Sequence, residues 1–374
     1  MNNRERLKAV MHGEAYDRLP CVAFGYWNET LDKWADEGHI SREASESYRT
    51  QGDSGPGDRQ VMEQLGIDFN WACCFGGETG LFPRFERKVI KTEPDGSQIM
   101  QEPTGHLVRI KPGVQSIPGE IGTLLTGREA WEKDFLPRLQ YTPERIPKER
   151  LAQLAAESEA RQEPLLLYCG SLYGAIRDML GVVELSYLQA DDEDLYVEII
   201  DTMANLAYKV AEGMLESGVA FDGAHFWEDI CFKNGPLVNP AVFEEYVGPH
   251  YKRITDLLAS HGIDIVSLDC DGCIDRLVPI WLENGVNTMF PIEVGTWNAS
   301  IAPWRAQYGP GLKGVGGMDK RVFSRDRAAV EQEIERLKPL VDLGGYIPCP
   351  DHRIPPDAKY ELVAYYCELF HKTF

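Results

Sequence analysis

From about residue 163 onward, the chain repeats one pattern: a short apolar run, a polar turn and then an amphipathic stretch. The runs are brief and end in polar or turn-forming residues, which is typical of buried strands. They cover residues 164–171, 219–229, 263–272, 286–294, 312–320 and 344–352. In residues 192–217 apolar side chains recur at three- and four-residue steps, which predicts a helix with one buried face.

Strand–helix alternation sustained over this length implies a parallel sheet with right-handed crossovers. An early strand at 18–27, with at least one more from the less regular region that follows, would complete a set of eight. We therefore predict an α/β protein that forms a single (β/α)8 TIM barrel over residues 1–374. The alternative is an open doubly wound sheet, but no glycine-rich phosphate loop follows the first strand to support it.

Residues 67–125 depart from this pattern. Alternating apolar and polar positions flank an Asp-Gly pair at 95–96, which predicts a β-hairpin turn. We interpret 67–125 as a hairpin-containing insertion that elaborates the N-terminal part of the barrel.

Composition narrows the possible partners. The chain has 374 residues, 43% of them hydrophobic, and a formal net charge of −21. This charge argues against nucleic acid or an anionic membrane as a partner. The first twenty residues lack the apolar core of a signal peptide. Nine irregularly spread cysteines favour reduced thiols, so we expect a cytoplasmic protein.

The predicted strands end in side chains that could carry chemistry. In a barrel such residues converge on the face formed by the carboxyl ends of the strands, where active sites lie. They are Tyr26, Trp27, Cys169, Ser171, His225, Glu228, Asp229, Asp269, Asp271, Glu293, Asp319, Cys349 and His352.

One subset has the chemistry of a metal site. Asp269 and Asp271 are two residues apart on a strand, so they share a face. Together with Cys349 or His352 they would supply carboxylate, thiolate or imidazole ligands, a set that suits zinc and leaves one position open. Alternatively, the carboxylates cap helices or pair with arginines. The CDGC segment at 270–273 also matches a redox motif, but it lacks the thioredoxin-like setting that this chemistry needs.

Acid–base chemistry could come from the same face. Glu228, with Lys233 five residues on, could be a carboxylate with a tuned pKa, or only part of a salt bridge at the rim. Asp271 and Asp319 are the other catalytic candidates.

Aromatic residues near the ends of the predicted strands 18–27 and 219–229 suggest an aromatic wall. It could stack a planar substrate or merely fill the barrel core. The candidate substrate-binding residues are Tyr26, Trp27, His225, Trp227, Glu293 and Arg353.

Five segments together resemble the uroporphyrinogen decarboxylase superfamily, in the right order and over nearly the whole chain. They are RERLKAVMHGEAYDRLP (4–20), GSLYGAIRDMLG (170–181), WEDICFKNGPLVNPAVF (227–243), LENGVNTMFPIEV (282–294) and GGYIPCPDHRIPPD (344–357). The resemblance implies a (β/α)8 barrel. True decarboxylases of this kind carry an arginine-rich loop after the first strand, whereas this chain reads FGYWNETLDKW there. The acidic strand ends would also repel a substrate with many carboxylates.

The other branch of the superfamily comprises zinc-dependent methyltransferases that exchange methyl groups with corrinoid proteins. Asp269 and Asp271 look like the counterparts of its His-x-Cys pair, and His352 of its last cysteine. This shift toward oxygen ligands puts a thiol substrate in doubt. The resemblance therefore implies a component that demethylates a small methylated donor, such as a methoxylated aromatic compound. Glu228 as an acid, or zinc, would stabilise the departing oxygen.

The chain has no Asp-x-His-x-x-Gly motif, so its corrinoid is expected on a separate corrinoid protein. We expect it to act alone or as a homodimer. Two other functions stay open. One is a metal-assisted decarboxylase or lyase of a small acid, with Arg177, Arg321 or Arg353 as carboxylate clamp. The other is a ligand-binding barrel without catalysis.

Overall fold

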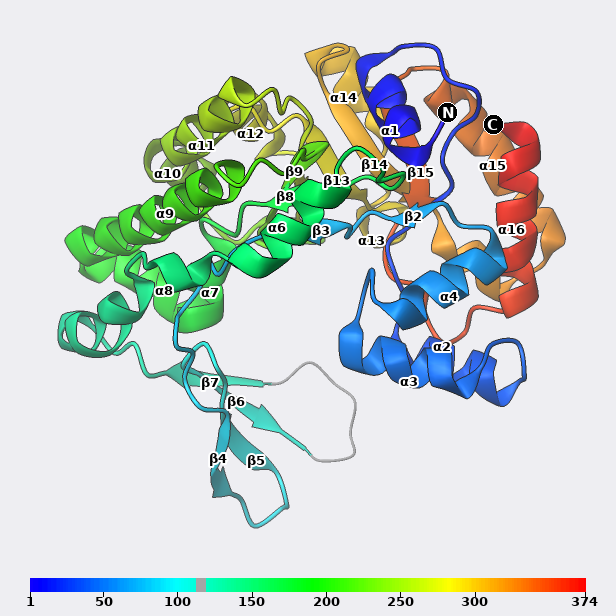
Figure 1. The fold of residues 1–374 in the computed structure, drawn as a ribbon. Helices are drawn as coiled ribbons and strands as arrows, with labels where there is room; N and C mark the ends of the chain where they lie inside the picture. The colour runs from blue at the N-terminus through cyan, green and yellow to red at the C-terminus, as the bar shows by residue number, and fades with distance from the viewer. Residues whose placement is uncertain (112–118) are drawn as a thin grey trace.

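The computed structural model describes residues 1–111 and 119–374, and its main sheet is parallel throughout (Figure 1). Seven strands pair in the order β15-β14-β13-β12-β9-β8-β3, which is the order of the chain read backwards. This order excludes the doubly wound alternative, in which the strand order reverses within the sheet. The strands are β3 (Cys74–Phe75), β8 (Leu166–Tyr168), β9 (Gly223–Trp227), β12 (Val266–Asp269), β13 (Thr288–Ile292), β14 (Lys313–Met318) and β15 (Tyr346–Pro350).

The N-terminal strands continue this arrangement in shorter pieces. β1 (Val22–Ala23) pairs in parallel with β2 (Phe69–Asn70), and Tyr26 forms a parallel bridge to Ile354, just beyond β15. A turn at Trp71–Cys73 separates β2 from β3, so the sheet is not continuous around a ring. The arrangement is compatible with the predicted (β/α)8 barrel.

Helices pack on the outside of the strands, as the periodicity predicts. The predicted helix at 192–217 is α9, and Asn239 caps α10 through its side chain, as expected before Pro240. The helices are α1 (Asn3–His12), α2 (Asn28–Asp36), α3 (Arg42–Gln51), α4 (Pro56–Leu65), α5 (Arg128–Ala130), α6 (Lys148–Glu157), α7 (Gly174–Leu180), α8 (Val182–Asp191), α9 (Glu193–Leu215), α10 (Pro240–Tyr246), α11 (Gly248–Ser260), α12 (Val278–Glu283), α13 (Val294–Trp297), α14 (Ile301–Tyr308), α15 (Arg327–Val341) and α16 (Tyr360–Thr373).

Short turns of other helix types complete the set: a π-helix, η1 (Trp131–Phe135), and the 3-10 helices η2 (Leu136–Leu139), η3 (Pro143–Arg145) and η4 (Lys320–Ser324). Within the described part of the chain, no helix is long and apolar enough to cross a membrane.

The region around Asp95–Gly96 forms an antiparallel sheet that projects from the strands and helices of the main body (Figure 1). Its strands are β4 (Lys88–Thr92), β5 (Gln98–Gln101), β6 (His106–Ile110) and β7 (Gly119–Thr123). β4 and β5 form the predicted hairpin, and Gly96 takes the left-handed φ of 80° that its turn requires. The excursion is therefore a four-stranded sheet, larger than the single hairpin predicted.

Candidate functional site

Three aspartates meet where two neighbouring strands end. Asp229 follows β9, Asp269 is the last residue of β12, and Asp271 lies two residues on. The parallel pairing of Trp227 with Asp269 brings the strand ends together, and the Asp271 backbone N–H donates to Asp229 Oδ1 at 3.0 Å. As a result, one ligand oxygen from each carboxylate lies within 4.8 Å of the other two. We call these three residues the acid cluster.

Burial and mutual repulsion disfavour the ionised forms of two carboxylates in the acid cluster. Burial and the charge of Asp271 raise the pKa of Asp229 to about 6. Burial and the charges of Asp229 and Asp271 raise the pKa of Asp269 well above its usual value. Oδ1 of Asp271 is shielded from solvent and has no hydrogen-bond partner in the described chain. Crowded carboxylates with an unpartnered oxygen are the features of a site for a cation.

Asp229 also has an unusual backbone. Its φ is 50°, in the left-handed region that non-glycine residues rarely adopt. Such a conformation costs on the order of 1–3 kcal/mol and is found most often at functional sites. Here it coincides with the turn that places the Asp229 carboxylate beside Asp271.

Two further predicted residues border the acid cluster. Nε2 of His352 lies 3.1 Å from Oδ2 of Asp271. Glu293 accepts hydrogen bonds from the Gly272 backbone N–H at 2.5 Å and from Thr296 Oγ1 at 2.6 Å. Burial raises the pKa of Glu293. The structure therefore brings together four predicted residues, Asp269, Asp271, Glu293 and His352.

Aromatic rings flank His352. Trp27 is 48% exposed and stacks on the imidazole, with ring centroids 6.3 Å apart and planes at 27°. Phe24 contacts the same imidazole edge-on at 5.2 Å. The predicted aromatic wall thus includes Trp27, whereas Tyr26 is buried between Trp34 and Tyr48, on the side of the N-terminal helices.

Glu228 lies in a different environment from Asp229. Its carboxylate is fully buried and accepts hydrogen bonds from the backbone N–H groups of residues 172–174, at the start of α7. Ser171 Oγ and the Tyr251 hydroxyl donate to it as well. Burial raises the pKa of Glu228, while these donors favour its charged form. This geometry is that of a buried helix cap, and the catalytic role of Glu228 stays a prediction.

Cys349 and Asp319 are not part of the acid cluster. Cys349 is fully buried in β15, where burial and the charge of Asp351 raise the pKa of its thiol. Asp319 caps η4 and forms two hydrogen bonds of 2.8 Å with the Arg321 guanidinium. The geometry supports neither a thiolate ligand from Cys349 nor proton transfer by Asp319.

His225 and Trp227 lie two residues apart on β9, so they share one face of the strand. His225 is buried, its Nδ1 lies 2.6 Å from Ser267 Oγ, and burial lowers its pKa to about 4. Its imidazole is therefore neutral near pH 7. Trp227 is half-buried, with the Arg177 guanidinium 5.7 Å from its ring centre.

The arginines considered as a carboxylate clamp all have partners. Arg353 is held by Asp53 and by the Tyr48 hydroxyl, at 3.1 and 2.9 Å from its NH1. Arg321 pairs with Asp319 and Arg177 with Asp178. A substrate carboxylate at the acid cluster would have to displace one of these partners.

The CDGC segment does not have the geometry of a redox pair. Cys270 is fully buried and accepts a hydrogen bond from the Ile230 backbone N–H at 3.3 Å, whereas Cys273 is half-buried. All nine cysteines are free thiols.

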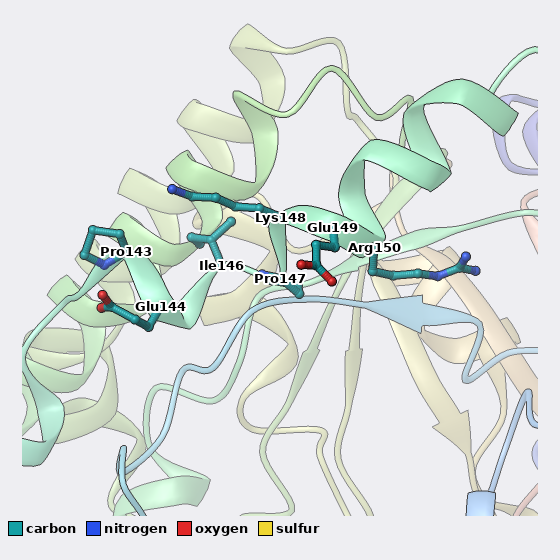
Figure 2. A pocket seen from close by; sticks show the side chains of 7 residues that line it. All are labelled: Pro143, Glu144, Ile146, Pro147, Lys148, Glu149 and Arg150. Atoms are coloured by element: carbon teal, nitrogen blue, oxygen red, sulfur yellow. The ribbon is translucent and has the colours of Figure 1, made fainter.

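A pocket of about 480 Å³ lies on the segment 143–150, at the start of α6 (Figure 2). The side chains around it, including Glu144, Lys148 and Arg150, point in different directions and do not converge on one point (Figure 2). None of the predicted site residues lines it, so we do not assign it a role.

No protein-family profile matches the chain, and no curated protein matches it. Solved structures do. A methyltransferase from Methanosarcina mazei aligns over 100% of this chain and 98% of its own, with 13% identity and a TM-score of 0.61. This likeness shows a shared fold.

Two further structures are less similar. A B12-independent methionine synthase from Shewanella sp. W3-18-1, in complex with selenomethionine, covers 94% of this chain and 96% of its own, with 10% identity and a TM-score of 0.48. A putative B12-independent methionine synthase from Listeria monocytogenes covers 96% and 98%, with 11% identity and a TM-score of 0.44. Both TM-scores are too low to bear on the fold.

The candidate ligands predicted from the sequence did not include Asp229. The signal was present: residues 225, 227 and 229 share one face of an extended strand, and residue 228 faces the other way. The same alternation was used to pair Asp269 with Asp271. Applied to residues 225–229, it favours Asp229 over Glu228 as the residue that faces the site.

Proposed function

We propose that the chain is a methyltransferase that moves a methyl group from a small methylated donor to the Co(I) corrinoid of a separate corrinoid protein. The observation that carries the proposal is the acid cluster at the carboxyl ends of β9 and β12, with the unpartnered, buried Oδ1 of Asp271. Its position is where barrels of this class carry their chemistry.

The residues present fit a divalent cation. Asp229, Asp269 and Asp271 would hold it, with His352 beside them as a further ligand or as an orienting partner of Asp271. Three carboxylates offer only oxygen ligands, which favour a hard cation such as Mg²⁺ or Mn²⁺. The predicted set that included a thiolate would have favoured zinc. When bound, the cation would act as a Lewis acid that stabilises charge developing on the donor's leaving oxygen.

The chain's own residues position the donor and its proton. Trp27, stacked on His352, offers an exposed aromatic face at the edge of the site. In the Nε2-protonated form, His352 holds a proton against Oδ2 of Asp271, where it is available to the leaving oxygen.

Two similarities support methyl transfer over the alternatives. The sequence resembles the methyltransferase branch of the uroporphyrinogen decarboxylase superfamily, and the fold is shared with a structure described as a methyltransferase. The decarboxylase alternative is weakened because its candidate arginines at the mouth already have partners.

The test combines metal content with turnover. Wild type, Asp271→Asn and the control Asp264→Asn, whose side chain is 65% exposed beside His12, are purified without chelator and measured by elemental analysis. We expect about one divalent cation per chain in wild type and control. In Asp271→Asn we expect a much lower content, because loss of a ligand weakens metal binding at least tenfold. Demethylation of methoxylated donors is then followed with a reduced corrinoid protein. If wild type holds no cation and transfers no methyl group, the proposal is wrong.

A further inference from the structure

A cavity of about 310 Å³ opens at the carboxyl ends of β8 and β9, and β9 is the neighbour of β12, which ends at Asp269. Tyr168, Ser171 and Trp227 line it from the strand ends, and residues 77–80 and Arg84 line it from the segment after β3. Trp227 lies two residues before Asp229. Trp227 is also the register partner of Asp269 in the parallel pairing of β9 with β12.

The cavity extends under the antiparallel sheet. A second space of about 160 Å³ shares Gly80, Arg84 and Ala175 with the first. Pro103 and Thr104, between β5 and β6, line it from the excursion. The sheet that projects from the main body thus forms one wall of a cavity whose other end reaches Trp227, the register partner of Asp269.

The lining of the first space is rich in hydrogen-bond donors. Tyr168, Thr79, Trp227 and Arg84 line it and each carries a hydrogen-bond donor, while Glu78 adds a carboxylate acceptor. The Ser171 hydroxyl, which also lines the space, already donates to Glu228. A ligand that fits this lining supplies acceptors.

Arg84 is the cation common to both spaces. It contacts Glu78 at 3.3 Å, but the two side chains are 65% and 45% exposed, so this pair is weak. A carboxylate on Arg84 would form a charge-assisted and geometrically matched contact.

Two carboxylates also line the cavity, Glu78 in the first space and Asp178 in the second, and Asp178 is paired with Arg177. Most of the other lining residues are apolar or aromatic. Trp227 and Tyr168 present rings to the first space, and Leu81, Met179 and Met203 line the second. The first space, at about 310 Å³, is at the low end of ligand pockets, which span roughly 300–1,000 Å³, and the second adds about 160 Å³. A single ring with its substituents fits them, and a tetrapyrrole does not.

We propose that this cavity binds a single-ring aromatic monocarboxylate, with its carboxylate on Arg84 and its ring against Trp227 and Tyr168. This inference rests on the proposed function, in which the methyl-bearing substituent at the other end of the ring would face the acid cluster. Arg84 would then determine specificity without touching the reacting atoms.

The test measures binding alone, on the full chain, by calorimetry and by quenching of tryptophan fluorescence. The probes are 4-methoxybenzoate and its neutral isostere 4-methoxybenzamide. We expect the benzoate to bind at least about tenfold more tightly than the amide, since one charge-assisted contact is worth about 1.4 kcal/mol or more. Arg84→Gln should remove this preference, and Trp227→Leu should weaken both ligands.

Arg87→Gln is the matched control. Arg87 lies three residues on, is 58% exposed and pairs with Glu102 outside the cavity, so its loss should leave both affinities within about twofold. Equal binding of acid and amide, an Arg84→Gln variant that binds like wild type, or no binding of the acid at millimolar concentration would each overturn the inference. Binding that depends on Arg84, without any methyl transfer, would uphold the cavity and overturn the proposed function.

Discussion

Glu228 and Asp229 are adjacent in the chain but their carboxylates lie in opposite environments. Glu228 accepts five hydrogen bonds at the start of α7, and Asp229 joins two other carboxylates at the strand ends. A carboxylate surrounded by donors is stabilised as an anion, whereas one surrounded by carboxylates favours a proton or a cation. Substitutions at the two positions should therefore have different consequences.

Replacement of Glu228 by glutamine should destabilise the fold. The amide turns an N–H₂ group toward backbone N–H donors, so buried hydrogen bonds are lost. We expect a loss of about 2–4 kcal/mol in the free energy of unfolding, measured with urea. The exposed Glu244→Gln serves as control and should change it by less than about 0.5 kcal/mol. A Glu228→Gln variant of wild-type stability that lacks activity would instead indicate the catalytic role predicted from the sequence.

Asp58 should make stability depend on pH. It is fully buried, burial raises its pKa to about 6, and its Oδ1 has no partner in the described chain. Because the folded pKa exceeds the unfolded value of about 3.9, its stabilising contribution is present below pH 4 and is lost as pH rises through 6. Asp58→Asn should gain stability relative to wild type between pH 4 and 7, by roughly 2–3 kcal/mol.

Urea unfolding at four pH values from 4 to 7 measures this difference. The exposed Asp357→Asn should leave the shape of the wild-type curve unchanged. Parallel curves for Asp58→Asn and wild type would show that Asp58 is ionised throughout this range.

Sequence patterns located the site better than they assigned its residues. Asp269 and Asp271 follow from strand alternation, and His352 from its place after the last strand. Cys349 was a ligand candidate because its chemistry suits zinc; it is buried in β15 and is not part of the acid cluster, so its role as a ligand stays a prediction. The partners of Arg353 could not be foreseen, because Asp53 lies 300 positions earlier in the chain.

At the scale of elements, one polar contact ties the N-terminal helices to the last strand. Arg353, just after β15, reaches Asp53, which follows α3, and the Tyr48 hydroxyl within α3. Gly25 packs against this contact: a Cβ there would lie 2.4 Å from Asp53 Oδ1. Because His352 precedes Arg353, the contact also helps to place the imidazole at Asp271.

A double-mutant cycle of Asp53→Asn and Arg353→Gln measures this link. The two side chains are 16% and 32% exposed, so we expect a coupling energy of about 1–2 kcal/mol in urea unfolding. The more exposed pair of Asp319 and Arg321 should give less than about 1 kcal/mol. Additive effects of the two substitutions would show that Arg353 does not fix the end of β15.

Element types were more predictable than element boundaries. The helix α9 and the six strand runs from 164 onward follow from periodicity, because each buries a regular face. The predicted strand 18–27 is only β1 and a single bridge, since its later residues turn toward the N-terminal helices. The predicted hairpin region 67–125 extends across residues 112–118, which lie outside the described residues.

At the scale of the whole molecule, the charge balance affects stability. The chain carries 59 acidic and 38 basic side chains. Repulsion between the excess negative charges is therefore stronger in the compact folded state than in the unfolded chain. Screening by salt should therefore raise Tm, by a few degrees between 20 and 300 mM NaCl. Thermal unfolding followed by circular dichroism tests this, with choline chloride to separate screening from sodium binding. A Tm that falls with both salts would contradict it.

The parallel order of the strands was predictable because alternating strands and helices allow few topologies. The break between β2 and β3 was not predictable, because no sequence pattern marks the turn at Trp71–Cys73 as an interruption of the strand.

The antiparallel sheet projects from the main body (Figure 1), and β6 and β7 contact it at α7, where the Thr123 hydroxyl donates to the Met179 carbonyl. It contributes to the cavity but provides none of the three aspartates of the acid cluster. On the proposed function, exchange of this segment between related chains would change which donors bind, while the acid cluster would stay intact. In a protein built in this way, preference for a substrate and competence for the reaction can evolve, or be engineered, independently.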